Sequence, residues 1–224
     1  DQRDRGDATD RRTLVMARRL LIFLAVVGLL FVAADFIMRQ VAEDRLAGRV
    51  GAALELEEDP RLELGGWPFV LHALDGNFPE VEVTADTLSA RGIVLEDVRV
   101  SLRNVRFELG DIISGTDRTV RTGGGRGTAA LSASALDAAV RGQGGDATFS
   151  FVDGQVVVNS ETLGQAAGTP AIEGRTLTIS AEDYPEPFSI RLPSIAGATY
   201  GSPEVVGGRL VVEMTLASGP LSLE

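Results

Sequence analysis

The only histidine of the chain, His72, is the first candidate for acid–base or metal chemistry, because histidine titrates near neutral pH. It follows Leu71 and precedes Leu74 in a short apolar segment, which favours a structural or partly exposed side chain over a general base. One histidine and no cysteine exclude the usual ligand sets of zinc. The sequence also lacks the Gly-x-Ser-x-Gly elbow of a serine nucleophile. We therefore expect a protein that is not an enzyme and has no cofactor.

Carboxylates and glycines gather at other points without forming a recognisable site. The acidic run Glu55–Asp59 lacks the spaced ligands and the glycine of a calcium-binding hand loop, so we interpret it as a solvated turn. Glu96-Asp97 and Glu182-Asp183 are interpreted as strand-end and turn residues. Residues 110–127 are predicted to form a loop, and their Gly123–Gly127 ending lacks the Gly-Lys-Ser/Thr of a phosphate loop. We expect neither a metal nor a nucleotide.

The chemistry that this sequence offers most clearly is the burial of hydrocarbon. Each buried methylene contributes about 0.8 kcal/mol, so a few turns of apolar wall suffice to hold an acyl chain. The candidate lipid-binding residues are Trp67, Phe69, Leu71, Leu74, Val81, Val83, Val98, Val100, Leu102, Val105 and Phe107. An ordinary dry core is the competing interpretation for each of them singly. Arg99, Arg103 and Arg106 are weaker candidates for a headgroup phosphate, because strand geometry turns the first two away from the apolar face.

A short helix and long strands must position these residues. Proline at position 68 suits a turn or the first position of a helix, so Phe69 to Leu74 is predicted to be helical. Gly76 is placed to end this helix, since glycine accepts the left-handed conformation common after a helix C-terminus. The alternation of Val81, Val83 and Ala85 with polar residues then predicts a strand with one apolar face.

The next strand pattern changes phase twice. Val98, Val100 and Leu102 have even numbers, whereas Val105 and Phe107 have odd ones, so a β-bulge is predicted near Arg103-Asn104. A second phase change separates Ile93 and Leu95 from Val98. Because bulges bend sheets, we expect a curled antiparallel sheet whose apolar face forms a trough.

The remaining elements follow from periodicity and turn residues. Asp35 to Leu54 is predicted to be a helix that continues out of the apolar N-terminal run, with Phe36, Ile37, Val41, Leu46, Val50 and Leu54 on its apolar face. Ser134 is predicted to begin a short helix that ends near Val140. Asp153-Gly154 predicts a hairpin between residues 147–152 and 155–158. Further strands are predicted at 176–180, 189–192 and 209–216, the last after a Gly207-Gly208 turn.

Most of the chain after the apolar N-terminal run, and most closely residues 65–109, resembles the actinobacterial LmeA family of cell-envelope phospholipid-binding proteins. The likeness rests on Gly-Trp-Pro-Phe, the apolar helix, Gly76, a strand and then Gly92-Ile-Val-Leu-Glu-Asp-Val-Arg-Val-Ser-Leu102, and it is looser beyond these residues. It implies a fold related to tubular lipid-binding proteins: α+β, mostly β, with a strongly bent antiparallel sheet wrapped around a long helix. It also implies a supporting role in making or maintaining lipomannan-type envelope glycolipids.

The N-terminal segment has two interpretations. Leu20 to Ala34 is an unbroken apolar run of 15 residues preceded by arginines, and extension through Met38 brings it near the ~30 Å of a bilayer core. As a single-pass plasma-membrane anchor it divides the chain into a cytoplasmic Arg-rich segment 1–19, a transmembrane segment 20–38 and an exported domain 39–224. Alternatively, Val32-Ala33-Ala34 is a signal-peptide cleavage site and the domain is secreted.

The charge distribution limits the partners. Residues 1–19 carry a net charge of +2 and residues 35–224 a net charge of −13. General attraction of the exported part to nucleic acid or to anionic membranes is therefore not expected. All 21 basic residues are arginine, and without cysteine packing alone must hold the domain together.

Three functions remain open at this point. The first is a phospholipid-binding protein of the cell envelope, at the plasma membrane, that holds acyl chains in an apolar groove. The second is a non-catalytic scaffold with a dry core that binds an envelope-biosynthesis protein partner. The third is an envelope lipid hydrolase with His72 as its base.

Overall fold

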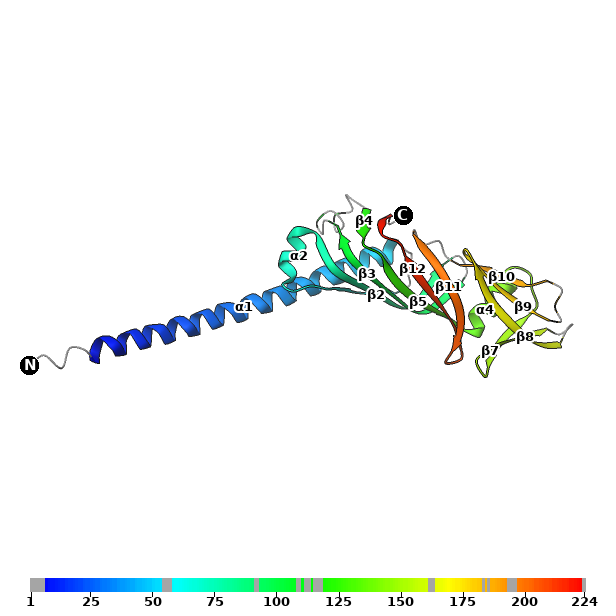
Figure 1. The fold of residues 1–224 in the computed structure, drawn as a ribbon, viewed down its shortest axis with the longest axis horizontal. Helices are drawn as coiled ribbons and strands as arrows, with labels where there is room; N and C mark the ends of the chain where they lie inside the picture. Colours follow the sequence, from blue (N-terminus) through cyan, green and yellow to red (C-terminus); the bar gives the residue numbers. More distant parts are fainter. Residues whose placement is uncertain are drawn as a thin grey trace, which may run out of the picture.

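The computed structural model describes residues 7–53, 58–90, 93–107, 110, 114, 119–160, 164–182, 184, 186–192 and 197–222 (Figure 1). Its helices are α1 (Asp7–Ala53), α2 (Phe69–Asp75) and α4 (Ala133–Gly142). Its strands are β1 (Arg61–Leu64), β2 (Asn77–Ala90), β3 (Ile93–Arg106), β4 (Thr119–Thr122), β5 (Gly125–Leu131), β6 (Thr148–Val152), β7 (Gln155–Ser160), β8 (Gly164–Glu173), β9 (Thr176–Ala181), β10 (Phe188–Arg191), β11 (Ala198–Val206), β12 (Arg209–Leu216) and β13 (Gly219–Ser222).

The strands form two open antiparallel sheets. The larger has the order β1-β2-β3-β5-β12-β11, with β4 paired to β3 and to β13. The smaller has the order β10-β9-β8-β7-β6 and lies at the end of the molecule away from the N-terminus (Figure 1). The predicted α+β class with mostly β structure is confirmed. Four of the strands in the smaller sheet lie where strands were predicted, at β6, β7, β9 and β10. The strand β8 was not predicted, because its small and polar residues give no apolar alternation, and the separation into a second sheet is a finding of the structure.

One face of the larger sheet, here called the inner face, carries two hydrophobic cores. The first core packs α1 and α2 onto β1, β2 and β3. Its most buried members are Phe69 of α2 and, on the sheet side, Leu64, Phe78 and Val105. The second core lies between the two sheets and includes α4 through Leu136. The helix α1 therefore covers only one end of the inner face.

The predicted phase changes in β3 are present, but their geometry differs from a simple bulge. Asn104 and Asp97 have positive φ angles of 50° and 49° at the two points where the apolar side chains change phase. The register between β2 and β3 is unbroken, because β2 changes phase at the same two levels. Against β5 the register does shift, between Glu96 and Arg99. Both strands thus bend together, and the expected extra residue near Arg103-Asn104 is absent from the β2–β3 pair.

The prediction of a loop over 110–127 is wrong at its C-terminal end, where β4 and β5 form. Gly125 and Gly127 lie in β5, between β3 and β12. A Cβ atom at Gly125 would lie 2.5 Å from the carbonyl oxygen of Ser101, and one at Gly127 would lie 2.8 Å from Cγ of Met214. The glycines are therefore required by close packing in the sheet. Most of residues 108–118 lie outside the described part.

The predicted helix from Asp35 is confirmed as part of the continuous helix α1, but its apolar face is partly wrong. Phe36, Ile37 and Val41 are exposed, and Leu54 lies outside the described residues. The side that packs on the domain carries Asp35, Ala42, Leu46, Ala47 and Gly51. Small residues replace the large ones on this side because they let the helix approach β1 closely.

The two turns predicted in the C-terminal half of the chain are confirmed. Asp153 and Gly154 have φ angles of 51° and 77° and join β6 to β7, and Gly207-Gly208 joins β11 to β12. Leu210, Val212, Met214 and Leu216 of β12 are all buried on the inner face. The start of α4 needs correction: Ser132, not Ser134, is the N-cap, and its Oγ accepts a hydrogen bond from the backbone N–H of Ala135.

Candidate functional site

The eleven predicted lipid-binding residues fall into three groups. The structure buries Phe69, Val81, Val98 and Val105, half-buries Val83, Val100, Leu102 and Phe107, and exposes Trp67, Leu71 and Leu74. The four buried residues fill the two cores, as the dry-core interpretation expected for single residues. A ligand can reach only the second and third groups without displacing core side chains.

The half-buried residues on neighbouring strands form an apolar strip between the two cores. This inter-core strip consists of Val83 and Ala85 of β2 and Val100 and Leu102 of β3. Val83 pairs with Val100 in the β2–β3 register, and Leu102 packs against both cores. Because neither core buries the strip fully, it retains apolar surface on the inner face that an acyl chain can cover.

The exposed group belongs to α2, which the structure holds against α1 by polar contacts. Oδ2 of Asp35 accepts a hydrogen bond from the N–H of Phe69 at 3.0 Å, and Oδ1 accepts one from the N–H of Val70 at 2.9 Å. Arg39 of α1 donates to the carbonyl oxygen of Gly66. Asp35 thus caps α2 from a distant helix, since Pro68 at the N-cap position provides no side-chain hydrogen bond.

The C-terminal end of α2 follows the sequence prediction. Gly76 has a φ angle of 61° and its N–H donates to the carbonyl oxygen of His72, a left-handed C-cap. Nδ1 of His72 donates to the carbonyl oxygen of Asn77 at 2.9 Å. His72 therefore has a local structural partner, and no group of three or more His, Asp or Glu side chains suited to a metal ion occurs within the described residues.

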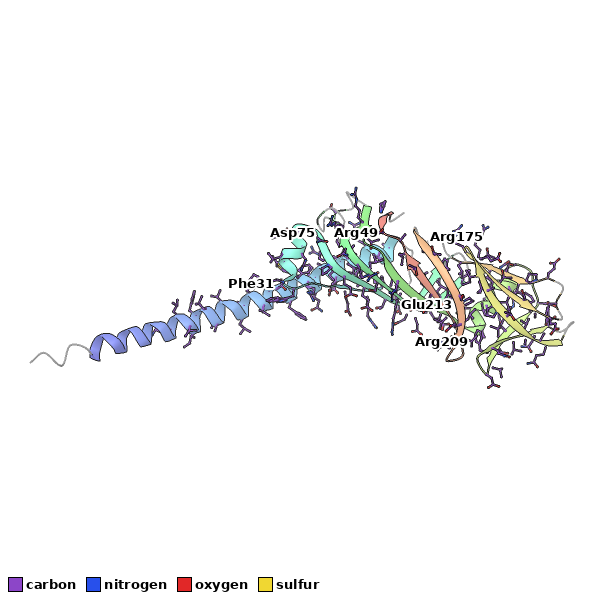
Figure 2. All side chains as sticks on the ribbon, in the orientation of Figure 1. Phe31, Arg49, Asp75, Arg175, Arg209 and Glu213 are labelled. Carbon is purple, nitrogen blue, oxygen red and sulfur yellow. The ribbon has the colours of Figure 1, made fainter. Side chains whose placement is uncertain are left out.

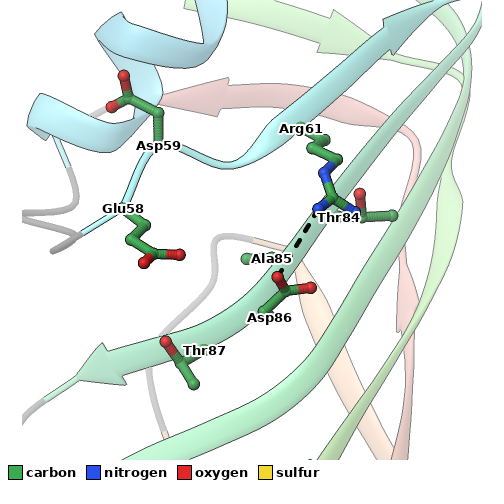
Figure 3. Close-up of a pocket in the computed structure, with 7 residues that line it drawn as sticks. All are labelled: Glu58, Asp59, Arg61, Thr84, Ala85, Asp86 and Thr87. Carbon is green, nitrogen blue, oxygen red and sulfur yellow. Dashed lines mark ion pairs between the residues drawn. The ribbon is translucent and has the colours of Figure 1, made fainter.

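Hollows among the described residues have polar side chains in their walls. One of about 60 Å³ lies beside Arg61 and Asp86, whose charged groups are 3.9 Å apart, and Glu58 and Asp59 also line it (Figure 3). A groove of about 600 Å³ runs between α1 and β1 and includes Phe36, Glu43 and Leu62. Its volume is in the range of ligand sites, but the carboxylates of its wall suit neither an acyl chain nor an anionic phosphate.

The arginines proposed as weak headgroup candidates lie on exposed positions. Arg99, Arg103 and Arg106 are exposed along β3. Arg99 borders a hollow of about 380 Å³ together with Arg209, which is labelled in Figure 2. Arg209 forms ion pairs with Glu96 and Asp97, and Arg99 lies on the opposite face of β3 from the strip residue Val100. The sequence expectation that Arg99 faces away from the apolar residues agrees with this placement.

Glu43, at the α1–β1 groove, should make folding stability depend on pH. Burial raises the pKa of Glu43 above its ordinary value of 4.5, against the opposing effect of the Leu64 N–H, which donates to Oε1 at 2.7 Å. A carboxyl with a higher pKa in the folded state binds protons better there, so this group's contribution to stability falls as pH rises through the window above 4.5. We expect Glu43→Gln to flatten this part of the stability–pH curve.

Urea unfolding at a series of pH values measures this slope. The matched control is Glu204→Gln, which changes an exposed carboxyl of β11. Equal slopes for the Glu43 variant and the unaltered chain would contradict the assignment.

Sequence reasoning missed the role of Asp35 and the distinction between covered and uncovered parts of the inner face. The signal for Asp35 was present: one carboxylate at the end of an apolar run, and a helix start at Phe69 without a capping side chain of its own. The extent of the strip carried no such signal, because the alternation of β2 and β3 is the same in covered and uncovered segments.

Together these features define an α+β protein, mostly β, built on a long apolar helix and with an apolar sheet face that is only partly covered. A family model described as LmeA-like phospholipid-binding matches residues 33–221, which is most of the chain, and the chain therefore belongs to that family. The comparison with curated proteins and the comparison with solved structures gave no match.

Proposed function

We propose that this chain is a non-enzymatic, membrane-anchored protein that binds phospholipid, with the acyl chain lying on the inter-core strip. The match to the LmeA-like phospholipid-binding family supports phospholipid as the ligand. The half-buried state of Val83, Val100 and Leu102 supports the inter-core strip as the binding site of the acyl chain, because these side chains still expose apolar surface on the inner face. Phe107 of the same group stacks against Phe78 in the first core, and we assign it a supporting role.

The proposal places the anchor in α1. Arg19–Ala52 contains a stretch long and apolar enough to cross a membrane. With residues 1–19 in the cytoplasm and 20–38 in the bilayer, residues 39–224 form the exported lipid-binding domain at the outer face of the plasma membrane. Cleavage near Ala34 is the alternative, and it leaves the contacts of Asp35 with α2 within the released domain. A supporting role in lipomannan-type envelope glycolipid biosynthesis belongs to the same proposal.

Native mass spectrometry of the full chain tests the binding. The chain is purified in mild detergent, released from the micelle, and its retained phospholipid is identified after organic extraction. We expect one phospholipid per chain, and a loss of at least about thirtyfold in affinity for the double variant Val83→Thr/Val100→Thr. The reason is that each hydroxyl placed against hydrocarbon costs about 1–3 kcal/mol, while the shape of the side chain is kept.

Val211→Thr is the matched control, because Val211 is half-buried on the opposite face of β12. It should retain phospholipid like the unaltered chain. Folded protein that carries no phospholipid and takes none from vesicles would sink the proposal. That outcome would favour the scaffold function. The two filled cores are one observation that agrees with a scaffold.

A further inference from the structure

The helix α2 and the residue pair before it expose apolar side chains that the described part of the protein leaves largely uncovered. Trp67, just before the helix, is 70% exposed, and Leu71 and Leu74 are 55% and 79% exposed. The opposite side of the helix is anchored by Phe69, which is buried in the first core. An amphipathic turn with one side in the core and tryptophan and leucine on the other is typical of a surface that contacts another apolar phase.

The position of α2 along α1 indicates what this exposed apolar surface contacts. The hydrogen bonds from Phe69 and Val70 to Asp35, and the one from Arg39 to Gly66, hold α2 beside the segment Asp35–Arg39. That segment directly follows the apolar run Leu20–Ala34, which projects from the domain without covering, as Phe31 does in Figure 2. Figure 1 shows α2 at the end of the sheet from which α1 emerges.

Helix geometry places the bilayer boundary at the same level. From Arg19 to Met38 a straight helix rises ~30 Å, which equals the thickness of the hydrocarbon core. With Arg19 at the inner boundary, the outer boundary falls at residues 35–38, beside α2. Trp67 then stands at the depth where tryptophan is enriched in membrane proteins. Phe36, Ile37 and Met38 of α1 are exposed and continue the apolar surface at this level.

We propose that Trp67, Leu71 and Leu74 insert into the outer headgroup and acyl boundary of the bilayer and dock the domain on the membrane surface. This inference rests on the proposed membrane anchor in α1. The net charge of −13 on residues 35–224 gives no attraction to anionic lipid, so apolar insertion and the tether supply the binding. A docked α2 would hold the larger sheet, which carries the inter-core strip, at the surface of the membrane from which the proposed phospholipid ligand comes.

Trp67 is the only tryptophan of the chain, so its fluorescence reports on α2 alone. The full chain is reconstituted into phosphatidylcholine vesicles, with and without lipids brominated at defined depths of the acyl chain. We expect a blue-shifted emission and strongest quenching by bromines nearest the headgroup. The variant Leu71→Glu/Leu74→Glu should lose both effects, because two carboxylates at the boundary oppose insertion.

The control Val152→Glu/Val206→Glu places the same charges on two exposed valines of β6 and β11 and should keep the blue shift and the quenching. The variant Val83→Thr/Val100→Thr should also keep them, which separates docking from loss of bound phospholipid. Emission typical of water and quenching only by soluble acrylamide would overturn the inference. So would protection from both acrylamide and brominated lipid, since that result would assign the surface to another protein chain.

Discussion

Replacing Phe78 with alanine should lower the free energy of unfolding by about 3–5 kcal/mol, the usual cost of truncating a fully buried aromatic ring. Phe78 of β2 has no exposed surface. Its ring centroid lies 4.9 Å from that of Phe107, in a stacked geometry, and 6.1 Å from that of Phe69 on α2. The ring thus joins α2 and the sheet under α1, and its removal leaves a cavity that these elements cannot close without moving.

Urea unfolding of the full chain, followed by the fluorescence of Trp67 and by circular dichroism, measures this change. Phe36→Ala is the matched control, because it removes the same ring from an exposed position of α1 and should change stability by no more than about 0.5 kcal/mol. Equal losses in the two variants would contradict the place of Phe78 in the first core. A larger shift by Trp67 fluorescence than by circular dichroism would indicate that α2 detaches before the sheets unfold.

Sequence prediction succeeds in this fold where apolar residues alternate clearly, and it fails where small residues give no pattern. The last long strand, β12, was predicted with its exact bounds, because alternating large apolar residues follow a glycine turn. The first three residues of the neighbouring strand β5 were predicted as the end of a loop, because two of them are glycines. These glycines are required there by the close approach of Leu102 and Met214 from the adjacent strands. Only the packed sheet shows that requirement, and a glycine run alone indicates flexibility.

The same argument applies to the candidate site. Alternation in β2 and β3 correctly identified the apolar inner face, and the helix at Phe69 followed from proline and glycine. Which parts of that face are covered depends on where α1 and α4 pack, and their contacts involve small residues such as Ala42 and Ala47 that carry a weak periodic signal. The burial of Val81 and the partial exposure of Val83, two residues apart on one strand, were therefore beyond prediction from sequence.

Replacing Asp35 with alanine should free the first turn of α2 from α1, while the ring of Phe69 stays buried in the first core. The two oxygens of Asp35 accept the only hydrogen bonds that the structure gives to the N–H groups of Phe69 and Val70, among its described residues. Alanine removes both acceptors, so amide hydrogen exchange at these two residues should rise more than anywhere in β2 or β3. Asp35→Asn keeps one oxygen acceptor without the charge and should give a smaller increase.

The comparison variant is Asp44→Ala, which removes an exposed carboxylate from the same helix. It should leave the exchange of Phe69 and Val70 unchanged. Unaltered protection in Asp35→Ala would show that Phe69, through its burial, suffices to hold α2. The expected loss would instead mean that a single carboxylate, placed where the apolar run ends, fixes the orientation of α1 relative to Trp67, Leu71 and Leu74. In vesicles the same variant should then weaken the depth-dependent quenching of Trp67, because an α2 whose first turn is free of α1 is held less firmly at the bilayer boundary.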